Sequence, residues 1–302
     1  MHTNCVKCLI LQANKLLEKH RIHDDDARDI IVRFRLFIDE HKNNNLTAPE
    51  AACLLHRMVK KVTNTNDLYA KEKKDYNNLM LSFEENTRDI IFRSENPFRT
   101  ALRYALAGNI IDFGPPEPFD VFKALSEAAH LQPAIDHSAL LLDELKKAST
   151  VLYLGDNAGE IVLDKLFIET INHPNLWFAV RGGNVLNDIT LVDAKKVGID
   201  KLAHIISNGY DAPSTILDRC SAEFRSKFEE ADIIISKGQG NLEGLIGNTD
   251  KKIFFLLMVK CNVIAEMIGV KEKSTVAFLN QKVVSMAENH SLDFNRYTVL
   301  MN

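Results

Sequence analysis

The pattern of apolar and polar residues changes near residue 150. Before this point, apolar residues recur at helical spacing with polar residues between them, which predicts amphipathic helices through residues 1–148. The clearest run spans residues 27–41, and the acidic cluster at 24–26 precedes it, as suits a helix N-terminus. The apolar face of that run carries Ile30, Ile31, Phe34 and Phe37.

Other helix signals follow in the same part of the chain. Thr47-Ala-Pro-Glu50 has the form of a capping box with proline in the first turn, and it predicts a helix toward Val62. Residues 65–96 are polar and are expected to be helical with exposed faces. A further helix is expected to start at Ser94-Glu-Asn-Pro97 and to end at Gly108-Asn109, and another to run from Asp136 to Lys147.

From residue 150 onward, short apolar runs alternate with segments that suit helices. The runs are rich in β-branched and aromatic residues and nearly continuous in apolar character, as strands buried on both faces are. This alternation predicts an α/β fold with a doubly wound, mainly parallel sheet. The expected strands are 150–154, 176–181, 203–207, 232–236, 252–258 and 275–279. The expected helices are 159–171, 189–197, 213–229, 241–247 and 261–269.

Polar residues and glycines gather after each of these predicted strands. In open α/β sheets, ligands bind at the carboxyl ends of the strands. Asp156 and Asn157 follow the first strand, and Asp188 follows the second. Together they would give three oxygen ligands to a hard divalent cation, with positions left for water and a phosphate oxygen.

Groups that suit a phosphate follow the later strands. Lys237 and Lys260 are predicted to be mobile point charges that meet phosphate oxygens. The turn at Gly238 and Gly240, with the N–H groups at Asn241, would form an anion-binding nest. A metal, two lysines and oriented N–H groups together can stabilise the negative charge on a phosphoryl group during its transfer.

Each of these residues also has an ordinary structural explanation. Asp156 or Asp188 alone is more often a helix cap, and Lys237 or Lys260 alone is usually a solvated surface residue. The glycine-rich turn is a poor match to a dinucleotide fingerprint and occurs in many folds. The convergence of all these residues on one sheet edge is what favours a metal and phosphate site.

Composition narrows the class of protein. The 302 residues are 46% hydrophobic and 26% charged, which is typical of a globular protein long enough for two domains. The net charge of -4 and the lack of a dense basic run argue against a nucleic-acid partner. No apolar stretch approaches the roughly 20 residues of a membrane span, and the N-terminus has no signal-peptide pattern. Five cysteines do not make a disulfide framework, so we expect a cytoplasmic protein; the sequence indicates no oligomeric state.

The N-terminal Cys5-Val-Lys-Cys8 pair has two interpretations. It supplies half of a zinc or iron–sulfur ligand set, and Cys53 and His56 are spaced to complete one from a predicted helix. A pair of reduced cysteines on an N-terminal helix is an equally good interpretation.

With these residues assembled, the sequence resembles the damage-control phosphatases. This family was formerly described as a domain of unknown function, and one member has also been named an acidic-residue methyltransferase. The resemblance runs from the Cys-x-x-Cys pair, which is similar to the prokaryotic branch, to about residue 280. The motifs that carry it are Gly155-Asp-Asn-Ala-Gly-Glu160, Asn187-Asp-Ile-Thr-Leu-Val-Asp-Ala194, Ser236-Lys-Gly-Gln-Gly-Asn-Leu-Glu243, Gly108-Asn-Ile-Ile-Asp-Phe113 and Lys260-Cys261.

The resemblance implies a helical subdomain, residues 1–148, packed on a Rossmann-like α/β domain, residues 149–302. It implies hydrolysis of phosphomonoesters of small metabolites, such as sugar phosphates or damaged phosphometabolites. It also implies a divalent metal (Mn²⁺, Co²⁺, Ni²⁺ or Mg²⁺) on the residues at 156, 157 and 188. The remaining positions expected at the catalytic or substrate site are Asn109, Asp112, Lys237, Gly238, Gly240, Asn241, Glu243 and Lys260.

Two mechanisms and two other functions stay open at this point. The nucleophile would be a metal-activated water or Asp156 itself, and we favour water because the chain has no Asp-x-Asp there. Glu160 and Glu243 are possible supporting or general-base groups. The alternative functions are an S-adenosylmethionine-dependent carboxyl methyltransferase, whose expected first-turn glycines and ribose-binding acid are lacking, and a non-catalytic phosphometabolite-binding protein.

Overall fold

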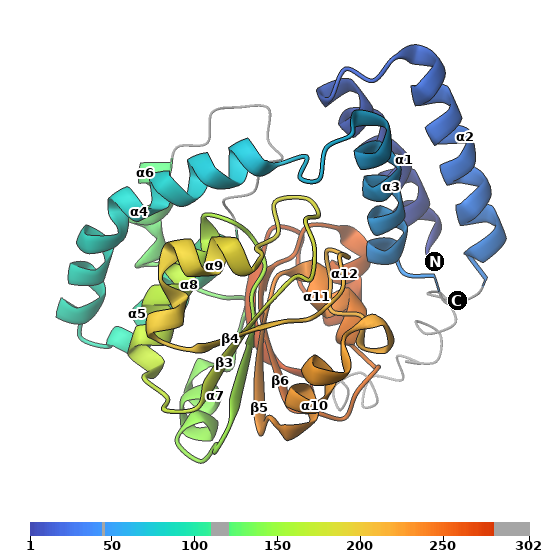
Figure 1. Cartoon of the computed structure of the whole chain (residues 1–302). Helices are drawn as coiled ribbons and strands as arrows, with labels where there is room; N and C mark the ends of the chain where they lie inside the picture. Colours follow the sequence, from blue (N-terminus) through green and yellow to red (C-terminus); the bar gives the residue numbers. More distant parts are fainter. Residues whose placement is uncertain (44–45, 110–120, 281–302) are drawn as a thin grey trace.

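A seven-stranded sheet forms the centre of the part of the chain that the structure describes (Figure 1). This computed structural model describes residues 1–43, 46–109 and 121–280. The strand order is β1-β7-β6-β5-β2-β3-β4, and every neighbouring pair is parallel except β6 and β7, which are antiparallel. The strands are β1 (Ile135–Asp136), β2 (Val151–Leu154), β3 (Leu176–Val180), β4 (His204–Ser207), β5 (Ile233–Lys237), β6 (Ile253–Met258) and β7 (Thr275–Leu279).

The mainly parallel α/β sheet expected from the sequence is confirmed, and the strands lie where the apolar runs predicted them to within a residue or two. The structure adds one short strand, β1, just before α7, in the part of the chain for which only helices were expected. The strand order reverses at β2, which has β3 on one side and β5 on the other. This is the topological switch point at which α/β folds of this kind bind ligands.

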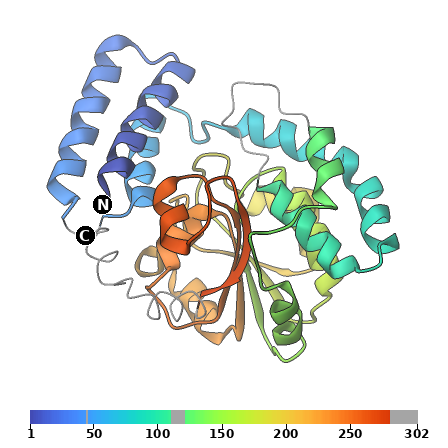
Figure 2. The same ribbon diagram turned by 180° about the vertical axis from the view of Figure 1, so that it is seen from behind.

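Helices cover both faces of the sheet and extend beyond it (Figures 1 and 2). They are α1 (Thr3–Lys19), α2 (Asp24–His41), α3 (Ala48–Thr63), α4 (Ala70–Arg93), α5 (Pro97–Gly108), α6 (Val121–Ala128), α7 (Ser138–Leu145), α8 (Glu160–Ile171), α9 (Leu191–Val197), α10 (Ala222–Glu230), α11 (Gln239–Leu245) and α12 (Asn262–Ile268), with short 3-10 helices at Ile199–Lys201 and Leu217–Arg219.

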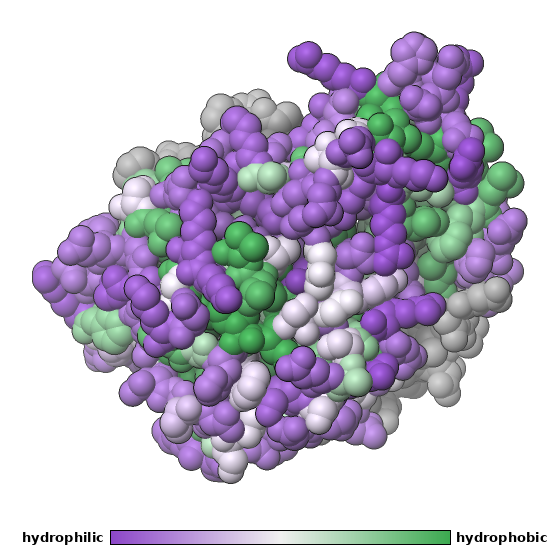
Figure 3. Space-filling view, viewed as in Figure 1, coloured by the Kyte–Doolittle hydropathy of each residue, from purple (hydrophilic) through white to green (hydrophobic). Residues whose placement is uncertain are grey.

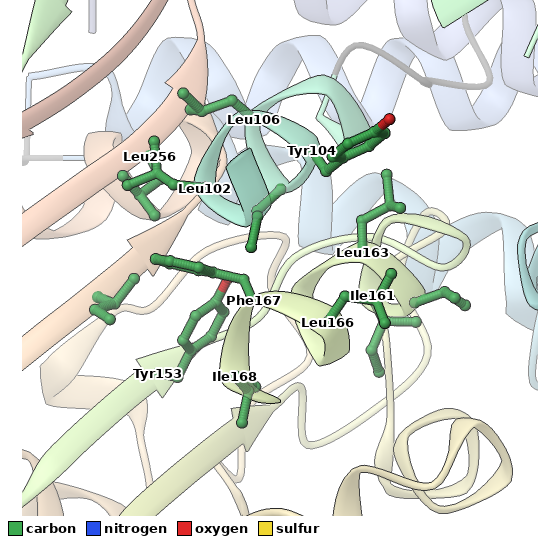
Figure 4. Packing of buried hydrophobic residues seen from close by; sticks show 14 of the residues in the cluster. Leu102, Tyr104, Leu106, Tyr153, Ile161, Leu163, Leu166, Phe167, Ile168 and Leu256 are labelled. Carbon is green, nitrogen blue, oxygen red and sulfur yellow. The ribbon is translucent and has the colours of Figure 1, made fainter. Parts of the chain in front are cut away.

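The two faces of the sheet bury separate hydrophobic clusters. Val151 and Tyr153 of β2 point into the cluster that contains α5, α7 and α8, while Leu152 and Leu154 point into the cluster with α10, α11 and α12. Figure 4 shows residues of the first cluster, where the Phe167 ring of α8 lies close to the Tyr153 ring. Because α5 and α7 share this cluster with α8, helices that precede β2 in the chain are part of the packing that holds the sheet.

The first three helices form a bundle with its own core. Phe34 and Leu55 are buried there, and residues of α1, α2 and α3 line the same cluster. The predicted capping box opens α3: the Thr47 side chain accepts from the Glu50 backbone N–H at 3.3 Å, and the Glu50 carboxylate accepts from the Thr47 backbone N–H at 3.1 Å. In both ribbon views this bundle lies beside α11 and α12 (Figures 1 and 2).

The predicted helix over residues 213–229 is wrong in its first half. Residues 208–221 form a loop that contains only the 3-10 turn at Leu217–Arg219, and α10 begins after the N-cap Ser221. The Ser214 hydroxyl donates to the Gly240 carbonyl at 2.7 Å, and the Thr215 hydroxyl donates to the Asn241 side chain at 2.9 Å. These contacts with α11 hold the segment in a non-helical path.

The surface in view in Figure 3 is mainly hydrophilic, with hydrophobic residues in scattered groups. Among the described residues, no helix combines the length and apolar character that crossing a membrane requires.

Candidate functional site

Two loops at the carboxyl edge of the sheet bring the predicted ligands together. The β2 loop (residues 155–159) carries Asp156 and Asn157, and the β3 loop (residues 181–190) carries Asp188. The Ile189 N–H donates to the Asp156 carbonyl at 2.9 Å, and Asn157 and Asp188 form an isolated antiparallel bridge. The main chains of the two loops therefore pair, and the three predicted ligands lie side by side.

The three predicted ligands are buried, and Asn157 is hydrogen-bonded to two carboxylates. The Asn157 amide nitrogen donates to Asp156 Oδ2 at 2.7 Å and to Glu160 Oε2 at 3.0 Å. Because this nitrogen is engaged with carboxylates, the amide oxygen is the atom that Asn157 would offer to a cation.

Arg181, at the end of β3, contacts both carboxylates. Its Nε donates to Asp188 Oδ2 at 2.6 Å, its Nη2 donates to Asp156 Oδ1 at 3.3 Å, and its Nη1 donates to Asn241 Oδ1 at 2.8 Å. Arg181 is a site residue that the sequence motifs do not predict. The signal was its place at the carboxyl end of a buried strand, between two acidic loops.

The buried carboxylates of the site carry more negative charge than the Arg181 guanidinium neutralises. Burial above all, and then the carboxylates of Asp188 and Glu160, raise the pKa of Asp156 to about 8 against the opposing charges of Arg181 and Lys260. No group of three or more His, Cys, Asp or Glu side chains in the described residues is arranged to hold a metal. The predicted set has two carboxylates and one carboxamide, and such hard oxygen donors fit a divalent cation that keeps part of its water shell.

Asn109, at the end of α5, connects the helical part to this group. Its amide nitrogen donates to Asp156 Oδ2 at 3.2 Å and to Glu160 Oε2 at 3.1 Å, and its oxygen accepts from the Met258 N–H at 3.0 Å. Asn109 is therefore a buried support behind Asp156. Asp112, the other residue expected from this segment, lies outside the described residues.

Glycine at position 238 is required by the approach of Asp156. Gly238 has a φ of +78°, and a Cβ placed there would lie 1.9 Å from Asp156 Oδ2. Gly240 is also confined, since a Cβ there would lie 2.2 Å from the Pro213 carbonyl oxygen. The turn after β5 thus lies directly against the carboxylate that follows β2.

Asn241 is a buried connector. Its amide nitrogen donates to the Lys237 carbonyl at 2.8 Å, and its oxygen accepts from Arg181 and Thr215. The side chain of Asn241 thus supports Arg181, and the anion-binding nest expected from its N–H groups stays a prediction.

Lys237 is not the mobile charge that the sequence suggested. Its side chain is fully buried, and its Nζ lies 2.6 Å from Glu160 Oε1, 2.6 Å from Asp164 Oδ1 and 2.7 Å from the Ala105 carbonyl. Burial alone would lower the pKa of Lys237, but the carboxylates of Asp164 and Glu160 raise it, so the ammonium stays charged. The correction has a simple cause: α8 supplies two carboxylates beneath the end of β5.

Lys260 and Glu243 lie at the outer side of the site. Lys260 is exposed. Burial raises the pKa of Glu243, as it does that of Asp156, and the charge of Lys260 opposes the rise at both. Its backbone N–H donates to Gln239 Oε1 at 2.8 Å, and the Gln239 amide donates to Glu243 Oε1 at 2.8 Å. Lys260 is therefore the predicted phosphate lysine that remains accessible to a ligand.

The cysteines and His56 do not build a metal site in the described residues. The Cys53 thiol donates to Asp211 Oδ1 at 3.4 Å, and His56 is buried against the Tyr69 ring. Cys5 and Cys8 lie on α1 as free thiols. Burial above all, and then the nearby Glu243 and Cys261, raise the pKa of Cys5 to about 11, so this thiol is protonated at neutral pH.

The comparisons with known proteins agree on one family. The sequence model of the damage-control phosphatase ARMT1-like domain matches residues 1–276. An uncharacterized protein of Methanocaldococcus jannaschii, MJ0202, is 37% identical and covers 88% of this chain and 91% of its own length. The damage-control phosphatase PH1575 of Pyrococcus horikoshii is 31% identical and covers 92% of this chain and 97% of its own. The crystal structure of that DUF89 family protein has a TM-score of 0.81 at 29% identity, and it covers 93% of this chain and 99% of its own.

Proposed function

The chain belongs to the damage-control phosphatase ARMT1-like family, and we propose that this phosphatase is metal-dependent and hydrolyses phosphomonoesters of small metabolites. The observation that carries the proposal is the meeting of Asp156, Asn157 and Asp188 on two paired loops at the switch point of the sheet. These residues would hold the divalent cation. When bound, such an ion supplies positive charge to the phosphoryl oxygens and lowers the pKa of a bound water.

Other residues of the chain would orient the ligands and receive the phosphate. Arg181 holds Asp188 and Asp156 from one side, and Asn109 holds Asp156 from the other. Lys260 is exposed beside the site and would meet phosphate oxygens with a charge-assisted hydrogen bond.

The hydrogen bonds of Asp156 support water as the nucleophile. Its Oδ1 accepts from Arg181, and its Oδ2 accepts from both Asn109 and Asn157. An oxygen that already accepts such bonds is a weaker nucleophile toward phosphorus. Glu160 is bound to Lys237 and to two amide groups, which supports a role in holding the site rather than in removing a proton.

We further propose Mn²⁺, Co²⁺, Ni²⁺ or Mg²⁺ as the metal, a sugar phosphate or damaged phosphometabolite as the substrate, and the cytoplasm as the location. Oxygen ligands do not select strongly among these ions. The five free cysteines support a reducing compartment, and the net charge of -4 supports the absence of a nucleic-acid partner.

The test is a screen of p-nitrophenyl phosphate and sugar phosphates with each of the four metals and with chelator. The Asp156→Asn and Asp188→Asn variants are measured beside Asp200→Asn, which changes an exposed aspartate outside the site. We expect metal-dependent phosphate release that both site variants lose and Asp200→Asn keeps. Turnover that chelator leaves unchanged, or full activity in either site variant, would overturn the proposal. Metal-independent binding of S-adenosylmethionine in calorimetry would favour the methyltransferase instead.

A further inference from the structure

Helix α4 places two buried polar side chains, Lys73 and Asn77, one turn apart in a strongly polar helix. Their sequence neighbours Lys74 and Asn78 are exposed. Lys73 is 4% exposed and Asn77 is 0% exposed, so both have been removed from water. Burial of a charge or an amide is unfavourable unless partners compensate it, and the partners of these two side chains lie at the two loops of the site.

Asn77 contacts the β2 loop. Its side-chain oxygen accepts a hydrogen bond of 2.7 Å from the Gly159 backbone N–H, at the last residue of the loop that carries Asp156 and Asn157. Gly159 has a φ of +81°, and a Cβ there would lie 3.3 Å from Tyr76 Cβ, so α4 lies directly against this turn. The bond fixes the point at which the loop passes into α8.

Lys73 contacts the β3 loop and the helix that follows it. Its Nζ lies 3.1 Å from Asn184 Oδ1, 3.2 Å from Asp193 Oδ2 and 2.8 Å from Asp67 Oδ2. Asp193 in turn accepts from the Thr190 backbone N–H at 2.9 Å in a capping box that opens α9. Lys73 is thus tied to residues on both sides of Asp188.

The two contacts are also joined to each other. The Asn77 amide nitrogen lies 3.5 Å from Asp193 Oδ1, so the Asp193 carboxylate contacts both Lys73 and Asn77. A second helix reaches the same loop, because Lys60 of α3 donates to the Asn184 carbonyl. Backbone hydrogen bonds therefore join the two loops that carry the predicted ligands, and side chains of α4 hold both loops from outside the sheet.

We propose that Lys73 and Asn77 are positioning residues, which we call the α4 clamp, and that they set metal affinity by fixing the β2 loop relative to the β3 loop. The inference rests on the proposed metal-dependent function and adds that α4 tunes the site without touching the metal or the substrate. Stability alone does not account for the clamp, since well-packed apolar residues in place of a buried ion pair are often neutral or stabilising.

The test uses the full chain with Mn²⁺ as the probe. The variants are Asn77→Ala and Lys73→Met, with Asn78→Ala and Lys74→Met as controls on the exposed face of α4 and Lys73→Arg as the charge-retaining variant. Mn²⁺ affinity is measured by calorimetry, and amide hydrogen exchange is followed across residues 155–161 and 181–190. A folded Asn77→Ser variant replaces Asn77→Ala if the alanine variant does not fold.

We expect the two clamp variants to bind Mn²⁺ about 10- to 100-fold more weakly, as removal of groups that orient metal ligands does elsewhere. Their exchange should rise in both loops, and KM at saturating metal should stay near the wild-type value. The two controls and Lys73→Arg should bind Mn²⁺ as the wild type does. If Asn77→Ala and Lys73→Met bind Mn²⁺ with wild-type affinity, the proposal is wrong.

The failure of the clamp and the failure of the proposed function give different results. If the wild type binds no Mn²⁺ and releases no phosphate, the metal-dependent function is overturned. Hydrogen exchange then still decides whether α4 holds the loops: unchanged protection of both loops in Asn77→Ala would overturn the clamp as well.

Discussion

Asn157 and Asp188 face each other across an isolated antiparallel bridge, although they come from loops after different strands. The Ala158 N–H donates to the Asn187 carbonyl on one side of the bridge, and the Ile189 N–H donates to the Asp156 carbonyl on the other. The backbone therefore fixes the separation of the two side chains before any ligand is present. Such preorganisation is what a site that stabilises developing charge requires.

Gly238→Ala is expected to abolish activity. The added methyl group would lie 1.9 Å from Asp156 Oδ2 and occupy a φ of +78°, so Asp156 must move, at about 1–3 kcal/mol of stability. Gly247→Ala is the matched control, because Gly247 has a φ of +73° with nothing within 4 Å of an added Cβ. Phosphatase assays and urea unfolding of both variants check the prediction. Equal activity in the two variants would contradict it.

Arg181→Met is expected to make stability depend on metal. The variant leaves Asp156 and Asp188 buried without the guanidinium, which is expected to cost about 3–5 kcal/mol in the presence of chelator. A divalent cation would restore part of the loss, because it binds the folded state. Unfolding with Mn²⁺ and with chelator measures the difference, and Arg225→Met, at an exposed arginine, is the control. The idea fails if Arg181→Met and wild type show the same gap between Mn²⁺ and chelator.

Lys237→Met is expected to act mainly on stability. It removes the ammonium from between Glu160 and Asp164, both fully buried, and breaking such a pair costs about 3–5 kcal/mol. Urea unfolding checks the loss of stability. A variant as stable as the wild type but inactive would contradict the buried pairing and return Lys237 to a direct role on the phosphate.

Lys260→Ala is expected to act on the substrate with little effect on stability, because the side chain is exposed. Loss of a charge-assisted hydrogen bond to phosphate of about 1.5–3 kcal/mol would lower kcat/KM by about 10- to 150-fold. Steady-state kinetics with a phosphomonoester at saturating metal measures this, and Lys271→Ala changes an exposed lysine after α12 as the control. Unaltered kcat/KM in Lys260→Ala would remove Lys260 from the phosphate site.

His56 is expected to make the fold sensitive to acid. Burial above all, and then the neighbouring charges of Lys60 and His20, lower its pKa to about 3. Its Nδ1 has no hydrogen-bond partner among the described residues. Because the unfolded chain takes up a proton near pH 6.5 and the folded chain does not, stability falls as pH falls from 6.5 toward 3, by about 2 kcal/mol at pH 5.

The His56→Phe variant tests this, since phenylalanine keeps an aromatic ring near Tyr69 and removes the titration. Urea unfolding at pH 7.5 and pH 5.0 is compared for the two proteins. Acidic groups titrate in both, so the difference between the two pH effects isolates His56. An equal loss of stability in variant and wild type would refute the assignment.

The strands could be predicted from the sequence because they depend on local composition, and the residues at their carboxyl ends could then be placed on one edge of the sheet. Apolar runs such as 253–258 are strands, and the residues after β2, β3 and β5 share an edge because parallel strands run the same way. The sequence missed the roles that depend on tertiary partners. Lys237 resembles any lysine at a strand end until α8 places Glu160 and Asp164 beneath it. Lys73 and Asn77 cannot be told from their exposed neighbours by sequence pattern, because residues 70–78 of α4 are almost all polar.

The short strand β1 has a consequence for the order in which the chain can fold. Among the described strands β1 pairs only with β7, through bonds such as the His137 N–H to the Ala277 carbonyl at 2.7 Å, and β7 in turn pairs with β6. A nascent chain therefore carries residues 135–136 unpaired until nearly everything else has left the ribosome. The insertion of β7 between these two neighbours completes the sheet, so the far edge of the molecule closes only after synthesis has passed residue 279.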